Sequence, residues 1–399
     1  MRKYINKFLI IIINILIIIT SGTVWQVRSG VYDIILVYII IIFLLINFDK
    51  LINKIKYLII CIIPILIYLS LGIYVYKGLY INLVVKIILL IIYFTICIKE
   101  EKLFIFNNFS KIILIYSFFN LIIYLLLQFN IIEFNNLVYL NSYEKSINKI
   151  YYTYSGIFYN WQGNFNIFGF NILRNSGIFV EAGRYGLFLS FSLIIEVLLK
   201  RKISIINILI LSIATITTVS TTSIILLIII LLTKYVTYNK KSDLLLFVGI
   251  PSTFLIAVVS IIAIFKDKLK TNIGSASLLL RIYDMKLALE YFKEKLIWGW
   301  GIGNDNLIKS ATYYGTTVDG NANGITKLLY QGGVFFTLFY IVLLILLFNF
   351  LNRKFGKLIS IVILGIFIFQ IASQGIIYDS ITIFILIFSY VEFWDKIKL

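Results

Sequence analysis

The sequence predicts an all-α integral membrane protein with about twelve transmembrane helices. Of its 399 residues, 61% are apolar and 14% are charged, whereas a soluble domain carries about 25% charged residues. The apolar residues form runs close to the roughly 20 residues that a helix needs to cross a bilayer. None of these runs alternates apolar and polar residues, so the spans are expected to be helices rather than barrel strands.

The predicted spans follow one another along the chain and form a single polytopic membrane domain over residues 1–399. In order they cover residues 8–25, 31–48, 58–76, 83–98, 112–129, 177–199, 203–218, 223–236, 244–265, 328–350, 358–373 and 381–394. Short polar breaks separate most of them. Two breaks are long, residues 130–176 and 266–327, and these are the expected sites of function.

The basic residues predict the orientation of the spans. The formal net charge is +18, and Lys and Arg gather in alternate breaks, at residues 2–7, 50–56, 99–111, 200–202, 234–241, 353–357 and 396–398. The short loops between them hold only Arg28 and Lys77. By the positive-inside rule both termini are cytoplasmic and both long loops are extracytoplasmic. The basic excess therefore indicates topology, and no nucleic-acid partner is expected.

The composition excludes several kinds of chemistry. The chain has no histidine, which excludes His-based metal sites, Ser-His-Asp triads and His proton shuttles. Cys61 and Cys97 lie inside apolar runs, where thiols behave as small hydrophobes. We expect no metal and no cofactor, so any catalysis must use carboxylates, Arg, Lys, Tyr or hydroxyl groups.

The first long loop is rich in aromatic residues around residues 151–165. Because aromatic rings prefer the membrane–water interface, the segment is expected to dip into the membrane surface. Neither long loop is typical of a separate soluble domain.

The second long loop contains a predicted amphipathic helix over residues 277–296, with Ser275 or Ser277 as its N-cap. Its apolar residues recur at steps of three and four, at Leu278, Ile282, Met285, Leu289, Phe292 and Leu296. We expect this helix to lie on the outer membrane interface. It should end at Gly299, Gly301 and Gly303, which break a helix and allow close approach of the backbone.

Three groups of residues are candidates for chemistry. Arg174, Glu181 and Arg184 lie at the outer mouth of the sixth span, where guanidinium groups could meet phosphate oxygens and Glu181 could act as a base. The alternative is snorkelling with a Glu181–Arg184 pair. Arg281 lies near the start of the predicted amphipathic helix, where a helix N-terminus favours an anion.

The third group is Asp319, Asn321 and Asn323, whose polar side chains could hold sugar hydroxyls, although ordinary loop chemistry explains them equally well. Asp33, Lys86 and Glu196 lie in or near spans. For each of them we expect pairing or snorkelling rather than function.

The order of these motifs resembles the O-antigen polymerase and ligase superfamily. The matching parts are Arg174-x-x-Gly-Ile-Phe-x-Glu181-x-Gly, then Arg281 with Ala288 and Phe292, then Trp298-Gly-Trp-Gly-Ile-Gly303, then Gln331-Gly-Gly333. The resemblance covers roughly residues 170–350. It implies a GT-C-like, metal-independent membrane glycosyltransferase that uses lipid-linked sugar diphosphates at the outer face of the bacterial cytoplasmic membrane.

The resemblance implies a role for each candidate. Arg174 and Arg281 match arginines of the family by position and would hold the diphosphate, with Arg184 as a further contact. Glu181 would deprotonate the attacking sugar hydroxyl in a one-step, inverting transfer. The expected partners are an undecaprenyl-diphosphate-linked glycan as donor and acceptor, membrane lipids, and a chain-length regulator.

One departure from the family bears on the reaction. Ligases of the superfamily carry a histidine in the second long loop, where this chain reads Asp319-Gly-Asn321-Ala-Asn323. The sequence therefore favours a polymerase of surface polysaccharide, such as O-antigen, capsule or exopolysaccharide. The alternatives are ligase-type transfer to another acceptor, or a flippase of lipid-linked oligosaccharides.

Overall fold

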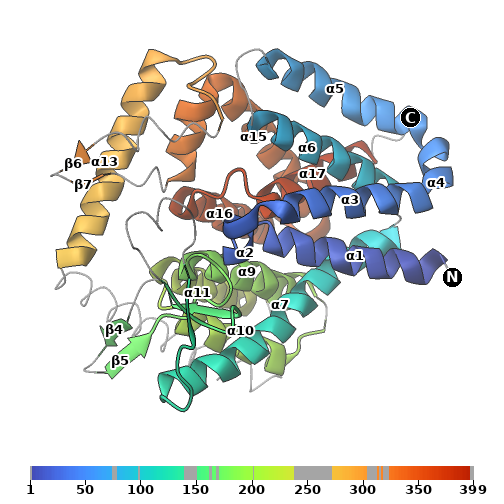
Figure 1. The fold of residues 1–399 in the computed structure, drawn as a ribbon. Helices are drawn as coiled ribbons and strands as arrows, with labels where there is room; N and C mark the ends of the chain where they lie inside the picture. The colour runs from blue at the N-terminus through green and yellow to red at the C-terminus, as the bar shows by residue number, and fades with distance from the viewer. Residues whose placement is uncertain are drawn as a thin grey trace. The chain divides into compact units, whose positions relative to one another are not determined.

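The computed structural model describes residues 2–73, 79–97, 99–138, 151–160, 164–167, 170–200, 202–237, 272–302, 312–313, 316–317 and 323–395. These residues are mostly helical (Figure 1). Each predicted span among them is helical over most of its length, and the span predicted at residues 244–265 lies outside the described residues.

The helices are named in chain order. They are α1 (Arg2–Ile19), α2 (Val24–Ser29), α3 (Val31–Ile46), α4 (Phe48–Asn53), α5 (Ile55–Ile73), α6 (Leu79–Ile96), α7 (Lys99–Gln128), α9 (Ala182–Leu193) with its π-helical continuation η1 (Ile194–Leu199), α10 (Ile205–Thr217), α11 (Thr221–Thr237), α13 (Asn272–Glu294), α15 (Gly324–Phe355), α16 (Lys357–Gln374) and α17 (Ser380–Trp394). By length and composition, α7, α9 with η1, α15 and α16 can each cross a membrane, and shorter apolar helices accompany them. This is the architecture expected of an α-helical membrane protein.

The chain divides into two compact units. Unit 1 contains residues 1–17, 33–104 and 276–399, and unit 2 contains residues 18–32 and 105–275. In unit 1, α15 packs against α16 and α17, and α17 packs against α6. Aromatic rings fill the space between α3, α6 and α17: Phe43 lies 5.1 Å from Tyr93, and Phe94 lies 4.8 Å from Phe384, between ring centroids.

Charged residues join the helix ends at one end of unit 1. The ion pairs there are Arg2–Asp49, Lys3–Glu100, Lys50–Glu101, Lys102–Glu392 and Lys102–Asp395. Beside them, Asn6 donates hydrogen bonds to Asn47 and Glu101. The charge pattern predicts that these helix ends lie on the same, cytoplasmic side, which stays a prediction.

A break in α15 organises another part of unit 1. Gly333 has φ 61° and ψ −167° and interrupts the helix. The segment after α13 runs along this break: Trp300 and Gly301 donate backbone hydrogen bonds to Tyr330 and Gln331. In return, the amides of residues 334 and 335 donate to the carbonyls of residues 296 and 297. The segment after α13 thus pairs backbone groups around the interruption, as a membrane environment requires.

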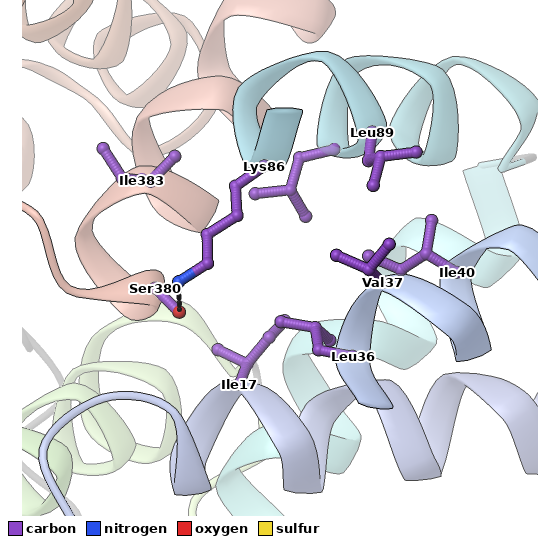
Figure 2. A pocket seen from close by; sticks show the side chains of 9 residues that line it. Ile17, Leu36, Val37, Ile40, Lys86, Leu89, Ser380 and Ile383 are labelled. Atoms are coloured by element: carbon purple, nitrogen blue, oxygen red, sulfur yellow. Dashed lines mark hydrogen bonds between the residues drawn. The ribbon is translucent and has the colours of Figure 1, made fainter. Parts of the chain in front are cut away.

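The described charges within the spans of unit 1 are paired, as expected. Lys86 of α6 forms an ion pair with Asp33 of α3, and its Nζ lies 3.4 Å from Ser380 Oγ (Figure 2). Figure 2 also shows the small cavity beside Lys86, which is lined by apolar side chains of α1, α3, α6 and α17. The cavity wall is hydrocarbon apart from Lys86 and Ser380.

Unit 2 is built around α9 and η1. All residues of α9 except Arg184 are buried, and α10 and α11 pack against it. A Cβ atom at Gly186 would overlap with Ser223, so glycine allows α9 and α11 to approach closely. Glu196 of η1 is 2% exposed and accepts hydrogen bonds from Ser110, Lys200 and Asn207. This confirms the pairing predicted for Glu196.

The long loops contain strands that the sequence analysis did not predict. Strands β1 (Asn136–Val138), β2 (Tyr151–Tyr154) and β3 (Phe158–Asn160) form an antiparallel sheet, and β4 (Asn164–Ile167) pairs with β5 (Phe170–Leu173). Strands β6 (Thr312–Tyr313) and β7 (Thr316–Thr317) form a third small sheet. Phe158 and Leu173 pack on Tyr124 and Leu127 of α7, which holds the first loop against this helix.

Candidate functional site

The candidate site in unit 2 is the segment Arg174 to Arg184, which leads from β5 into α9. Residues 174–176 have no regular structure, residues 177–178 form a turn, and Glu181 is the N-cap residue of α9. Phe179 forms an isolated antiparallel bridge with Thr23, so the segment is also tied to the chain between α1 and α2. Arg174, Glu181 and Arg184 therefore lie along one continuous segment, and their role as a site stays a prediction.

Tyr116 of α7 fixes the turn in this segment. Its hydroxyl oxygen accepts a hydrogen bond from the backbone N–H of Ile178 at 2.7 Å. Gly177 has φ +56°, and a Cβ atom there would lie 3.2 Å from Cζ of Tyr116 and overlap with its hydroxyl. Glycine is required here because the backbone is left-handed and the tyrosine is close.

Arg174 is anchored at the C-terminal end of α10. Its Nε donates a hydrogen bond to the carbonyl oxygen of Thr218 at 3.2 Å. The neighbouring Asn175 donates to Thr217 from its backbone N–H and its Nδ2, both at 3.0 Å. A helix C-terminus presents carbonyl groups that accept such hydrogen bonds and favours a cation. The base of the guanidinium is thereby held in place, and the side chain is half-buried.

Glu181 is not used to cap its own helix. Its backbone is extended (φ −135°, ψ 145°), as is usual at an N-cap, but the carboxylate makes no capping hydrogen bond. The N-cap side chains of Thr23, Ser204 and Asn323 accept hydrogen bonds from their helices, whereas the N-cap side chains of Asn47 and Asp379, like that of Glu181, do not. Within the described part of the chain Glu181 has no ion pair, so the Glu181–Arg184 pair considered from the sequence is absent.

Arg184 lies over the chain that follows α1. A Cβ atom at Gly22 would lie 2.7 Å from both Cδ and Cζ of Arg184 and would overlap with its guanidinium. Gly22 has φ +89°, and its carbonyl oxygen accepts a hydrogen bond from the N–H of Val180 at 3.1 Å. Gly22 therefore allows Arg184 to lie flat against the backbone that holds the site segment.

Tyr159 of β3 connects the first long loop to the same segment. Its backbone N–H donates to the carbonyl of Gly177 at 2.9 Å, and its own carbonyl accepts from Ser176 Oγ at 2.5 Å. Burial raises the pKa of the Tyr159 hydroxyl, and the nearby charge of Arg28 lowers it in part. Sequence reasoning missed Tyr116, Gly22 and Tyr159. It also passed over Arg28, although a cation in a short outer loop was a visible exception to the charge rule.

Arg281 belongs to unit 1 and lies on α13. The helix begins at Asn272, so Ser275 and Ser277 lie inside it and are not N-caps. Arg281 is well inside the helix, and the argument that it sits at a helix N-terminus was wrong. Its side chain lies outside what the structure describes.

The exposed and buried side chains of α13 show how the helix is oriented within unit 1. The apolar residues Met285 (39%) and Leu289 (38%) are exposed, and Leu296 just beyond the helix is 51% exposed, whereas Asp284 and Ala288 are buried. Ala288 packs with Tyr330 of α15. Within the helix, Met285 and Leu289 of the predicted apolar stripe therefore face outward, as expected for a helix at a lipid interface, whereas Phe292 of the same stripe packs against Ala288 and Tyr330.

The third group of candidates is only partly described. Asp319 and Asn321 lie outside the described residues. Asn323 is the N-cap of α15, and its Oδ1 accepts hydrogen bonds from the N–H groups of Ile325 and Thr326 at 3.0 and 3.3 Å. The structure thus gives Asn323 a capping role, and its contact with sugar stays a prediction.

Comparisons with protein-family models, with curated proteins and with solved structures each found no match to this chain.

Proposed function

We propose that this protein is a polysaccharide polymerase that joins oligosaccharide repeat units carried on undecaprenyl diphosphate, at the outer face of the bacterial cytoplasmic membrane. The proposal is supported by the order of the sequence motifs and above all by one structural observation. Glu181, whose carboxylate does not cap its own helix, lies between Arg174 and Arg184 in the sequence, and contacts from α7, α10, β3 and the chain after α1 hold this segment in place.

The arginines are suited to hold a lipid diphosphate. A guanidinium group donates paired hydrogen bonds to phosphate oxygens and keeps its charge at any physiological pH. In the transfer, negative charge develops on the diphosphate as the glycosidic bond breaks, and fixed cations stabilise that charge. The anchoring of Arg174 on Thr218 and of Arg184 on Gly22 reduces the reorganisation needed at that moment.

Glu181 is the proposed general base. In the proposed step, the oxygen of the acceptor hydroxyl attacks the anomeric carbon of the donor, and the bond from that carbon to the diphosphate oxygen breaks. The hydroxyl proton passes to the carboxylate of Glu181, and the lipid diphosphate leaves as an anion. Attack on the face opposite the leaving group inverts the anomeric configuration.

The placement of charges favours this enzyme over the flippase alternative. A flippase needs charged or polar groups that face a path through the middle of the membrane. Among the described spans, Asp33 is paired with Lys86, and Glu196 is held by Ser110, Lys200 and Asn207. These charges are engaged by protein partners, whereas Arg174, Glu181 and Arg184 lie in the predicted outer segment.

The proposal is tested by the glycan profile of cells that carry variants of the gene. Glu181→Gln and Arg174→Ala should abolish the ladder of long chains while single repeat units remain, with the protein still present in the membrane. Glu133→Gln, which alters an exposed carboxylate of the first loop, is the matched control and should leave the ladder unchanged.

The alternatives give different results in the same experiment. Free, full-length polymer that is not attached to its acceptor would indicate ligase-type transfer. Repeat units that accumulate on the cytoplasmic side would indicate a flippase. An unchanged ladder in both site variants would overturn the assignment of the site.

A further inference from the structure

The short helix α2 carries a group of residues that the proposed reaction does not yet use. It lies between α1 and α3, in a loop predicted to be outside the membrane. Its Arg28 is one of only two cations in the short outer loops, against the usual distribution of charge. Such an exception calls for a physical reason.

We propose that Trp25, Arg28 and Tyr32 form a carbohydrate-binding subsite that holds a pyranose ring of the lipid-linked glycan next to the reaction centre. This inference rests on the proposed function, because it assigns the glycan to a place beside Arg174, Glu181 and Arg184.

The first observation is a partly exposed aromatic pair. The rings of Trp25 and Tyr32 are stacked, with centroids 6.5 Å apart and planes at 29°. Both side chains are only partly buried. Aromatic faces offer rigid apolar area that packs against the C–H faces of a sugar ring.

The second observation is a cation on the same side of the helix. Arg28 follows Trp25 by three positions, so the two side chains are neighbours on α2. Arg28 is exposed and lies near the hydroxyl of Tyr159, whose ionisation it influences. Its guanidinium supplies several donors in a fixed arrangement, which suits hydroxyl groups or an acidic sugar.

The third observation is that α2 is built onto the candidate site. Val24 N–H donates to the carbonyl of Ile178 at 2.9 Å, and Val180 N–H donates to the carbonyl of Gly22 at 3.1 Å. The indole N–H of Trp25 donates to the carbonyl of Gly156 at 3.1 Å. Residues 22–32 thus connect the two places: Gly22 at one end lies against Arg184, and the other end carries the aromatic pair.

A purely structural role makes a different prediction. Tryptophan and tyrosine also anchor helices at the membrane interface. Such an anchor would affect the amount of protein in the membrane, and it would not affect the affinity for a sugar. Binding and kinetics therefore separate the two roles.

The kinetic test uses purified protein and the lipid-linked repeat unit extracted from a strain that lacks the gene. Trp25→Ala and Arg28→Ala should each raise KM by about tenfold, the equivalent of one aromatic or charged contact, with kcat changed less than about twofold. Trp25→Phe keeps an aromatic face and should recover most of the affinity. An unchanged KM in both alanine variants would overturn the proposal.

The binding test needs no catalytic activity. The probe is the oligosaccharide released by mild acid from the same lipid-linked material, titrated against tryptophan fluorescence. Wild-type protein should show saturable quenching, and Arg28→Ala, a change at an exposed residue, should weaken it about tenfold. If wild-type protein binds the oligosaccharide but Arg174→Ala leaves polymer formation unchanged, the proposed reaction is rejected and the subsite is kept. No saturable binding by wild-type protein would reject the subsite.

Discussion

Gly299 and Gly333 lie against each other, although they belong to motifs far apart in the sequence. A Cβ atom on Gly299 would lie 2.6 Å from the backbone nitrogen of Gly333, and a Cβ atom on Gly333 would lie 2.6 Å from the nitrogen of Gly299. Both have a left-handed backbone, with φ +67° and +61°. This contact holds the segment after α13 against the break in α15.

The contact predicts a large effect of adding one methyl group. Gly299→Ala and Gly333→Ala should each destabilise the protein by at least about 2 kcal/mol, because the new Cβ meets backbone atoms that cannot move aside and the left-handed conformation is strained. Thermal unfolding in detergent measures the change.

Two other glycines serve as controls. Gly301 has φ +102° but open space around it, so Gly301→Ala reports the backbone strain alone. Gly365 lies within α16 with open space, and Gly365→Ala should be neutral or stabilising by up to about 1 kcal/mol. Equal stability of Gly333→Ala and Gly365→Ala would contradict the account of the α15 break.

The hydrogen bond from Ile178 to Tyr116 predicts a second effect. Tyr116→Phe leaves the buried N–H of Ile178 without its acceptor, which should cost about 1–3 kcal/mol and lower polymer formation by misplacing Glu181. Tyr124→Phe on the same helix removes only a long contact of 3.5 Å to Gln128 and is the matched control. Similar stability and polymer yield in the two variants would show that Tyr116 does not position the segment.

The hydroxyl of Tyr159 predicts a dependence of stability on alkaline pH. Its pKa is raised in the folded protein, chiefly by burial. The contribution of this hydroxyl to the free energy of unfolding is fully present below the pKa of tyrosine in the unfolded chain, about 10. That contribution is lost as the pH rises from there through the pKa of Tyr159 in the folded protein. Between those values the unfolded chain loses the proton and the folded chain keeps it. In chemical unfolding experiments at pH 9 to 11, the free energy of unfolding should fall more steeply with pH for wild-type protein than for Tyr159→Phe. Identical slopes for the two proteins would contradict the assignment of this pH dependence to Tyr159.

The exposed apolar residues Met285 and Leu289 of α13 predict contact with lipid. A fluorescent label on Leu289→Cys should be quenched by lipids that carry a spin label near the headgroup, whereas a label on Glu290→Cys, about 100° around the helix, should be quenched much less. The native Cys61 and Cys97 are buried, so they should react little with the label. Equal quenching at the two positions would place α13 away from the membrane surface.

Hydropathy and charge were sufficient to predict most of the helices. The runs of apolar residues are long, and the pairs Arg2–Asp49 and Lys50–Glu101 join ends that the charge rule had assigned to one side. The strands could not be found in this way, because β1 and β3 have three residues each and a period of two is not recognisable over so short a stretch.

The candidate site was predictable only in part. Arg174, Glu181 and Arg184 are close in sequence and unusual near an apolar span, so local reasoning finds them. Their supports are Tyr116 and Gly22, which lie on other elements. Contacts over such separations leave no local pattern in one sequence. The start of α13 was misjudged because serines inside a helix resemble N-caps.

The most direct test of the central claim is polymerisation by the purified protein, supplied with the lipid-linked repeat unit alone. Wild-type protein should form long chains whose new linkage is inverted at the anomeric carbon, as measured by NMR. Glu181→Gln should be slower by about 100- to 10,000-fold, the usual worth of a general base. Long chains formed at the wild-type rate by Glu181→Gln, or a new linkage with retained configuration, would contradict the account.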